Sequence, residues 1–219
     1  GYVKIVVRST KNLPETFHTS DNLTIIEASI LDLSDDELNT LVEECDAVAS
    51  CLGHTLSFKG IYGQPRGLVT QAVKILCSAV KVKQREKPLK YVLMNTTGNS
   101  NRDLDEKISW KQKCVMGLIR ALLPPHTDNE HAADYLREQI GQNDDTIQWA
   151  AVRPDGLINE EEVTAYKIHA SPTRSAIFDA GTTSRINVGH FMAELICNND
   201  TWNQWKGKMP VIYNEAAQK

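Results

Sequence analysis

Residues 91–98 read YVLMNTTG, a short apolar run followed by a polar turn that ends in glycine. Similar apolar runs of strand length recur along the chain, at residues 3–7, 23–26, 47–52, 149–152 and 209–213. A strand that is apolar at consecutive positions is covered on both of its faces. These runs therefore indicate a mostly parallel sheet that lies between layers of helices.

Helix-forming patterns fill the intervals between the apolar runs. Residues 34–37 read SDDE, the signature of a capping box, and an apolar stripe follows as far as Cys45. Pro65 is expected in the first turn of a second helix, whose apolar stripe runs to Val80. A third helix is predicted over residues 108–123, because a pair of prolines follows it.

Two more helix starts are predicted further along the chain. Thr127 and Glu130 have the spacing of a second capping box, which would open a helix that runs towards Gly141. Asn187 is expected to cap the last long helix, with apolar side chains facing inward behind it.

Strands that alternate with helices predict an α/β fold, a doubly wound and mostly parallel sheet with helices on both faces. The length of 219 residues favours a single domain over residues 1–219. Residues 156–185 break the alternation, and we interpret them as a small loop-rich C-terminal extension on the substrate side. It would lie over the carboxyl ends of the strands, where such folds bind ligands.

Composition excludes several classes of function. The net charge is -4 and no block of lysine or arginine stands out, which disfavours nucleic acid and anionic membranes as partners. No apolar run approaches the roughly 18 residues of a membrane span. The five cysteines are scattered without a CxxC pair, as is typical of the reducing cytoplasm. Cysteines and histidines form no ligand-spaced set, so no metal is expected.

The segments at the ends of the predicted strands form an ordered series. They read VVRS at 6–9, LDL at 31–33, SCLG at 50–53, MNTTG at 94–98 and VRP at 152–154. In this order and spacing they resemble the atypical short-chain dehydrogenase/reductases, the NmrA-like NAD(P)-binding Rossmann family. The resemblance covers nearly the whole chain, and it implies a nicotinamide dinucleotide as cofactor.

The resemblance also implies where the cofactor would lie. Basic residues after the first strand bind the 2′-phosphate of NADP in this family, so NADPH is expected to be preferred over NADH. Arg8 could equally lie in a solvated loop, Asp32 could be a turn residue, and Arg153 could be a structural anchor. The residues expected to contact the cofactor are Arg8, Ser9, Lys11, Asp32, Leu33, Ser50, Leu52, Gly53, Thr96, Arg153 and Pro154.

The candidate catalytic residues are Thr96, Thr97 and His126. Relatives often carry a serine at the end of this strand, where it binds the substrate carbonyl, and threonine supplies the same hydroxyl. The family's Tyr-x-x-x-Lys pair would fall on His126 and Glu130, and the chain contains no YxxxK motif. His126 could still donate a proton, and Asn129 could orient a substrate.

The sequence departs from the family at its glycine-rich loop. Members start with a strand that carries GxxGxxG, and this sequence has no such element before residue 3. The glycine-rich residues 60–67 follow the wrong strand. We expect the missing strand between the first and third strands, on roughly 20 residues upstream of Gly1, the size of one βα half-unit. Without it, a gap of about 10 Å would divide the sheet.

Three functions follow as hypotheses. The first is an NADPH-dependent oxidoreductase that reduces a small carbonyl or unsaturated substrate. The second is a non-catalytic NADP(H)-sensing protein that binds a protein partner. The third is a scaffold that has lost its nucleotide site.

Overall fold

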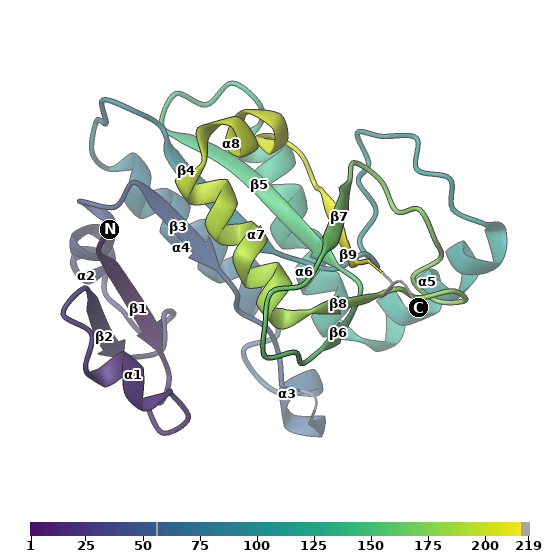
Figure 1. Cartoon of the computed structure of the whole chain (residues 1–219), viewed down its shortest axis with the longest axis horizontal. Helices are drawn as coiled ribbons and strands as arrows, with labels where there is room; N and C mark the ends of the chain where they lie inside the picture. The colour runs from purple at the N-terminus through teal and green to yellow at the C-terminus, as the bar shows by residue number, and fades with distance from the viewer. Residues whose placement is uncertain (56, 216–219) are drawn as a thin grey trace.

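The computed structural model describes residues 1–55 and 57–215. Strands and helices alternate along most of the chain, as Figure 1 shows. The strands are β1 (Val3–Val7), β2 (Leu23–Glu27), β3 (Ala47–Ser50), β4 (Leu89–Met94), β5 (Ile147–Pro154), β6 (Gly156–Ile158), β7 (Tyr166–His169), β8 (Thr182–Ser184) and β9 (Val211–Asn214). The helices are α1 (Glu15–His18), α2 (Asp35–Val42), α3 (Phe58–Tyr62), α4 (Leu68–Lys81), α5 (Trp110–Leu122), α6 (Pro124–Asp134) with the π-helical η1 (Tyr135–Ile140), α7 (Arg185–Cys197) and α8 (Asn199–Trp205).

The main sheet has the strand order β3-β4-β5-β9-β7. Its strands are parallel except β7, which runs antiparallel to β9. Helices α4 and α6 cover one face, and α7 and α8 cover the other (Figure 1). The prediction of an α/β fold with a mostly parallel sheet and helices on both faces is confirmed.

Alternate residues of β4 and β5 point into two different hydrophobic cores. Leu93 and Trp149 belong to the core beneath α4 and α6, whereas Val92 and Ala150 belong to the core beneath α7 and α8. All four side chains are at most 1% exposed. This burial on both faces is the reason that the two strands read as continuous apolar runs.

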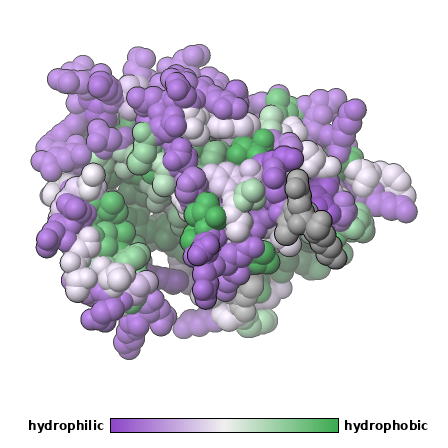
Figure 2. Space-filling view, in the orientation of Figure 1, coloured by the Kyte–Doolittle hydropathy of each residue, from purple (hydrophilic) through white to green (hydrophobic). Residues whose placement is uncertain are grey.

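The strand pairs β1–β2 and β3–β4 belong to separate sheets. β1 pairs with β2 alone, and β3 pairs with β4 alone, so the facing edges of β1 and β3 have no strand partner among the described residues. The interruption lies where the sequence predicted it, between the first and third strands. Figure 2 shows a hollow with apolar side chains in this part of the molecule, between the β1–β2 layer and the main sheet.

Two helix ends agree with the sequence prediction. Ser34 caps α2, where its Oγ accepts from the Glu37 backbone and the Glu37 carboxylate accepts from the Ser34 N–H at 2.8 Å. Helix α5 ends at Leu122, before Pro124. Both outcomes depend on neighbouring residues in the sequence, which is why a local pattern predicts them.

Three other predicted helix starts are wrong. Pro65 lies in a turn after a cis bond, and α4 begins only at Leu68. Helix α6 begins at Pro124, whose fixed φ suits a first turn, so the supposed box of Thr127 and Glu130 lies inside the helix. Ser184, not Asn187, caps α7; the Asn187 N–H donates to the Ser184 hydroxyl at 3.2 Å.

Residues 156–185 contain more strand than predicted. β6 and β8 pair with each other, and β7 extends the main sheet next to β9. The partners of β7 lie more than 40 positions away in the sequence, at residues 211–214. Strands whose partners are distant in the sequence leave little local sequence pattern, so the segment was predicted to be a loop.

Candidate functional site at the carboxyl ends of the strands

Basic side chains follow β1 on its carboxyl side. Arg8 and Lys11 are exposed, and neither lies within 4.0 Å of a carboxylate in the part of the chain that the structure describes. Ser9 is exposed beside them, and its hydroxyl accepts from the Lys11 backbone at 3.4 Å. The neighbouring Glu27 carboxylate, which the sequence analysis missed, binds Thr10 through its N–H and its hydroxyl at 3.1 and 2.7 Å. That bond holds the loop against β2 and leaves the two cations free.

The next two strand ends are more enclosed. After β2, Asp32 is exposed and Leu33 is half-buried. After β3, Ser50 is 5% exposed, Leu52 is half-buried and Gly53 is exposed. A Cβ added at Gly53 would have no atom within 4 Å, so open space surrounds this backbone. A planar or sugar-like ligand could approach the chain closely there.

A network of asparagines holds the end of β4. Asn95 Nδ2 donates to the Asn129 carbonyl of α6 at 2.9 Å, and Asn95 Oδ1 accepts from the Thr96 N–H at 2.9 Å. Thr96 is half-buried and its hydroxyl accepts from the Gly98 N–H at 3.2 Å. These bonds dock α6 on the strand end and fix the Thr96 hydroxyl at the turn.

The structure brings two of the candidate catalytic residues together. A Cβ at Gly98 would lie 3.3 Å from His126 Cε1 and 3.7 Å from Thr96 Oγ1. Gly98 therefore lets the imidazole and the hydroxyl come close to the same turn. The third candidate, Thr97, directly follows Thr96. It is buried, and its N–H donates to the Pro154 carbonyl at 3.0 Å.

His126 faces an ion pair. Arg120 of α5 donates to both Glu130 carboxylate oxygens, over 2.7 to 2.9 Å. His126 Nε2 lies 3.3 Å from Glu130 Oε1, without hydrogen-bond geometry. Burial raises the pKa of Glu130, but the nearby His126 imidazole and the bonds from Arg120 outweigh burial and bring the pKa to about 2. An ionised carboxylate beside the imidazole can hold the ring in one orientation.

Arg153 is fully buried at the end of β5. Its guanidinium donates to Glu106 at 2.7 and 3.2 Å, and to the backbone carbonyls of Asn99, Ala170 and Met209 at 2.7 to 3.2 Å. These bonds use all five guanidinium donors. Arg153 thus ties together the segment after β4, the extension and the segment before β9, and Pro154, also buried, is the last residue of β5.

Comparisons with known proteins show the family and the fold of the chain. A protein-family model described as NAD(P)H-binding matches residues 2–199. The chain belongs to this NAD(P)H-binding family. A search of curated protein sequences found no match.

Solved structures share the fold of this NAD(P)H-binding protein. A short-chain dehydrogenase/reductase from Veillonella parvula in complex with NADP is 15% identical, with a TM-score of 0.62, over 100% of this chain and 85% of that chain. A Rossmann-fold NAD(P)-binding family protein from Shigella flexneri is 16% identical, with a TM-score of 0.60, over 99% and 82%. The anaerobillin reductase ChuY from Escherichia coli O157:H7 is 13% identical, with a TM-score of 0.62, over 100% and 87%.

A buried aspartate that the sequence analysis missed organises the start of α4. Asp128 is 3% exposed, and its carboxylate accepts from the Val69 and Thr70 N–H groups at 2.8 and 2.9 Å and approaches His54 Nε2 at 2.8 Å. The carboxylate satisfies orphan donors at the positive end of the α4 dipole. The only local signal was the TDNE run at 127–130, which suggested a cap for the wrong helix.

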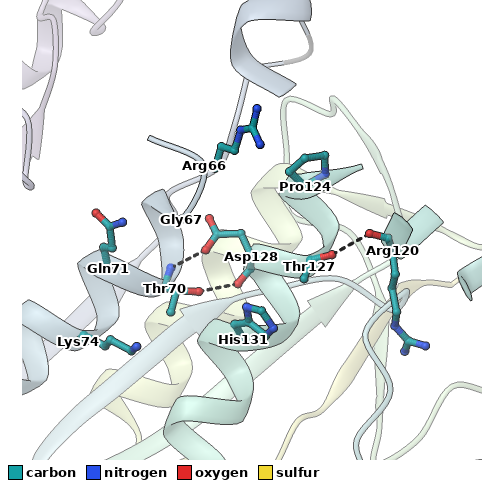
Figure 3. A pocket seen from close by; sticks show the side chains of 10 residues that line it. All are labelled: Arg66, Gly67, Thr70, Gln71, Lys74, Arg120, Pro124, Thr127, Asp128 and His131. Carbon is teal, nitrogen blue, oxygen red and sulfur yellow. Dashed lines mark hydrogen bonds between the residues drawn. The ribbon is translucent and has the colours of Figure 1, made fainter. Parts of the chain in front are cut away.

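Two cavities lie in different places relative to the strand ends. One of about 460 Å³ lies between the start of α4 and helix α6, and Figure 3 shows Arg66, Lys74 and His131 around Asp128. The other, of about 360 Å³, includes Thr97 at the end of β4. Of these two cavities, only the second contains a predicted site residue, Thr97.

No group of three or more His, Cys, Asp or Glu side chains that could hold a metal ion occurs within residues 1–55 and 57–215. In the same ranges, no helix is both long and apolar enough to cross a membrane.

Proposed function

We propose that this protein is an NADP(H)-binding oxidoreductase, active in the cytoplasm, that reduces a small carbonyl or unsaturated substrate. The observation that carries the proposal is the exposed pair Arg8 and Lys11, which follows the carboxyl end of β1 and has no carboxylate within 4.0 Å among the described residues. Thr96 and Thr97 follow the carboxyl end of β4 in the main sheet. Arginine binds phosphate through a planar fork of donors, which suits the 2′-phosphate that distinguishes NADP from NAD.

The residues present fit the two ends of such a cofactor. Arg8, Ser9 and Lys11 would hold the 2′-phosphate, with Asp32 and Leu33 beside the adenine. Ser50, Leu52 and the open backbone at Gly53 would receive the nicotinamide half. Because its five donors are used, Arg153 would act by positioning the end of β5, where Pro154 lies. When bound, the reduced nicotinamide supplies the hydride.

Thr96, Thr97 and His126 would serve the substrate. The threonine hydroxyls would donate hydrogen bonds to a carbonyl oxygen, where negative charge develops as hydride arrives. His126, held near Gly98 by α6, would deliver the proton, and the ionised Glu130 would keep the imidazole oriented for that transfer.

We propose further that the strand carrying the phosphate-binding glycines enters between β1 and β3. Both edges offer unpaired backbone groups, and a parallel strand would join the two sheets through hydrogen bonds on both sides. The first helical turn after that strand would place backbone N–H groups at the pyrophosphate.

Thermal unfolding of the full-length protein tests the cofactor proposal. A saturating ligand at 100 times its Kd is expected to stabilise the fold by about 2.7 kcal/mol, which raises the Tm by roughly 5–11 °C at this size. NADPH is expected to produce this shift at much lower concentration than NADH.

The Arg8→Gln variant makes the test specific for the 2′-phosphate. Loss of a charge-assisted fork is expected to weaken NADPH binding by about 10- to 100-fold and to leave NADH binding nearly unchanged. Lys206→Gln removes an exposed cation beyond α8 and should leave both affinities as they are. Equal losses for NADPH and NADH in Arg8→Gln would contradict the assignment, and no shift with either cofactor would favour a scaffold without a nucleotide site.

A second candidate function, an NADP(H)-sensing protein, is favoured by the lack of a Tyr-x-x-x-Lys pair in α6 and η1. Tyr135 precedes Gln139, not lysine, and His126 is engaged with Glu130. This function requires that a protein partner bind with different affinity in the presence and absence of NADPH, since coupling between two sites is reciprocal. NADPH oxidation with any carbonyl or quinone substrate would decide for the oxidoreductase.

A further inference from the structure

The cavity at the end of β4 is a polar chamber between three segments. Its walls come from Thr97 and Ser100 after β4, from Ser109 and Gln112 at the start of α5, and from residues 172–175 of the extension. Ser175 Oγ donates to Gln112 Oε1 at 2.8 Å, which joins the extension to α5 beside the cavity. Figure 1 shows the loops of these segments next to α5, on the side of the molecule opposite the β1–β2 sheet.

The carboxylate in the cavity wall is neutralised inside the protein. Glu106 lines the cavity, but its side chain is 3% exposed and binds the Arg153 guanidinium at 2.7 Å. The nearby Asp155 carboxylate accepts from the backbone N–H groups of Gly156 and Gly181, at 3.0 and 2.8 Å. The Arg153 guanidinium thus compensates the charge of the carboxylate that lines the cavity, and Asp155 is not among the lining residues.

The cations in the wall are less satisfied. Lys107 has no carboxylate within 4.0 Å of its ammonium group among the described residues. Arg174 is paired with Asp179: its Nε donates to the Asp179 backbone carbonyl at 2.8 Å and its Nη2 donates to the carboxylate at 2.6 Å, which leaves Lys107 as the lining cation without a partner among the described residues. The uncompensated charge of the cavity wall is therefore positive.

The start of α5 adds donors to the same wall. Ser109 Oγ accepts from the Gln112 N–H at 3.2 Å, while the N–H groups of Trp110 and Lys111 have no acceptor among the described residues. Helix α5 has 13 residues, and its N-terminal end borders the chamber through Ser109 and Gln112. The positive end of the helix dipole therefore lies at the chamber. Serine and threonine hydroxyls line the remaining wall and can donate to a carboxylate.

We propose that the substrate carries a carboxylate, which Lys107 and the start of α5 bind, while its reducible group lies towards Thr97. This inference rests on the proposed oxidoreductase function and names its substrate class. An ammonium group and backbone N–H donors are the partners that a carboxylate needs, and a chamber of about 360 Å³ is within the range of small-molecule sites.

The test uses 4-carboxybenzaldehyde and its uncharged methyl ester as probes, with the full-length protein and NADPH. Affinity is measured by calorimetric titration and turnover by NADPH absorbance. The acid is expected to bind about tenfold more tightly than the ester, and Lys107→Gln should bring the two affinities close together. Lys113→Gln removes an exposed cation of α5 that does not line the cavity, and should keep the preference for the acid.

The proposal is overturned if acid and ester bind equally, if the acid does not bind up to its solubility limit, or if Lys113→Gln abolishes the preference as Lys107→Gln does. NADPH titration of the wild-type protein without probe separates the two levels of inference. Binding of the acid without binding of NADPH would contradict the oxidoreductase function and support the carboxylate site. Turnover of the ester alone with NADPH would support the oxidoreductase function and contradict the carboxylate site.

Discussion

Replacement of Arg153 by methionine is expected to lower the free energy of unfolding by about 3–5 kcal/mol. The substitution leaves the Glu106 carboxylate buried without its cation, and it leaves three backbone carbonyls without their donor. Such a loss is a large part of the total stability of a domain. Urea denaturation, followed by tryptophan fluorescence, measures it.

A matched substitution separates burial from charge. Arg102 pairs with Asp134 at 2.7 Å, but its side chain is 49% exposed, so Arg102→Met should cost less than about 1 kcal/mol. Combining Arg153→Met with Glu106→Leu should recover part of the loss, since no unpaired charge then stays buried. A cost for Arg153→Met as small as that for Arg102→Met would show that the anchor is not structural.

The second large effect concerns pH. The folded-state pKa of Glu130 is about 2, lowered from the ordinary value of 4.5. A depressed pKa contributes stability that is fully present above 4.5 and is lost as the pH falls through the folded-state value. The span between the two pKa values corresponds to about 3 kcal/mol. Glu130→Gln should therefore be less stable than the wild type at neutral pH and should lose less stability on acidification.

Denaturation midpoints measured from about pH 6 to about pH 3 check this prediction, because the difference between variant and wild type should shrink as the pH falls. Glu44→Gln is the control, since Glu44 is exposed and forms no ion pair among the described residues. It should follow the wild type throughout. A constant difference between Glu130→Gln and wild type over the whole range would contradict the assigned pKa.

The fold could be predicted from the sequence wherever the information is local. The continuous apolar runs of β4 and β5 predicted burial on both faces, and the two cores on either side of Leu93 and Val92 are the physical reason. The Ser34–Glu37 box formed because both partners lie within one turn. Pro124 overrode the second box, because its fixed φ began the helix three residues earlier.

The candidate site was less predictable, because its contacts join distant segments. Glu130 looked like a cap, but Arg120 of the preceding helix binds it. Arg153 was left as either a cofactor contact or an anchor, and its partners at 99, 106, 170 and 209 could not be inferred from spacing. Lys107 and Arg174 carried no signal at all, since isolated cations in polar segments usually indicate solvent exposure.

The separation of β1–β2 from the main sheet has a consequence for ligand length. A dinucleotide bound as proposed would place its phosphate end on one sheet and its nicotinamide end on the other, as a bivalent tether between two half-sites. The packing of α2 on α4 sets the effective concentration of one half-site near the other. Each half of the cofactor alone would then bind far more weakly than its share of the contacts suggests, and the intact molecule would join the two sheets into one cooperative unit.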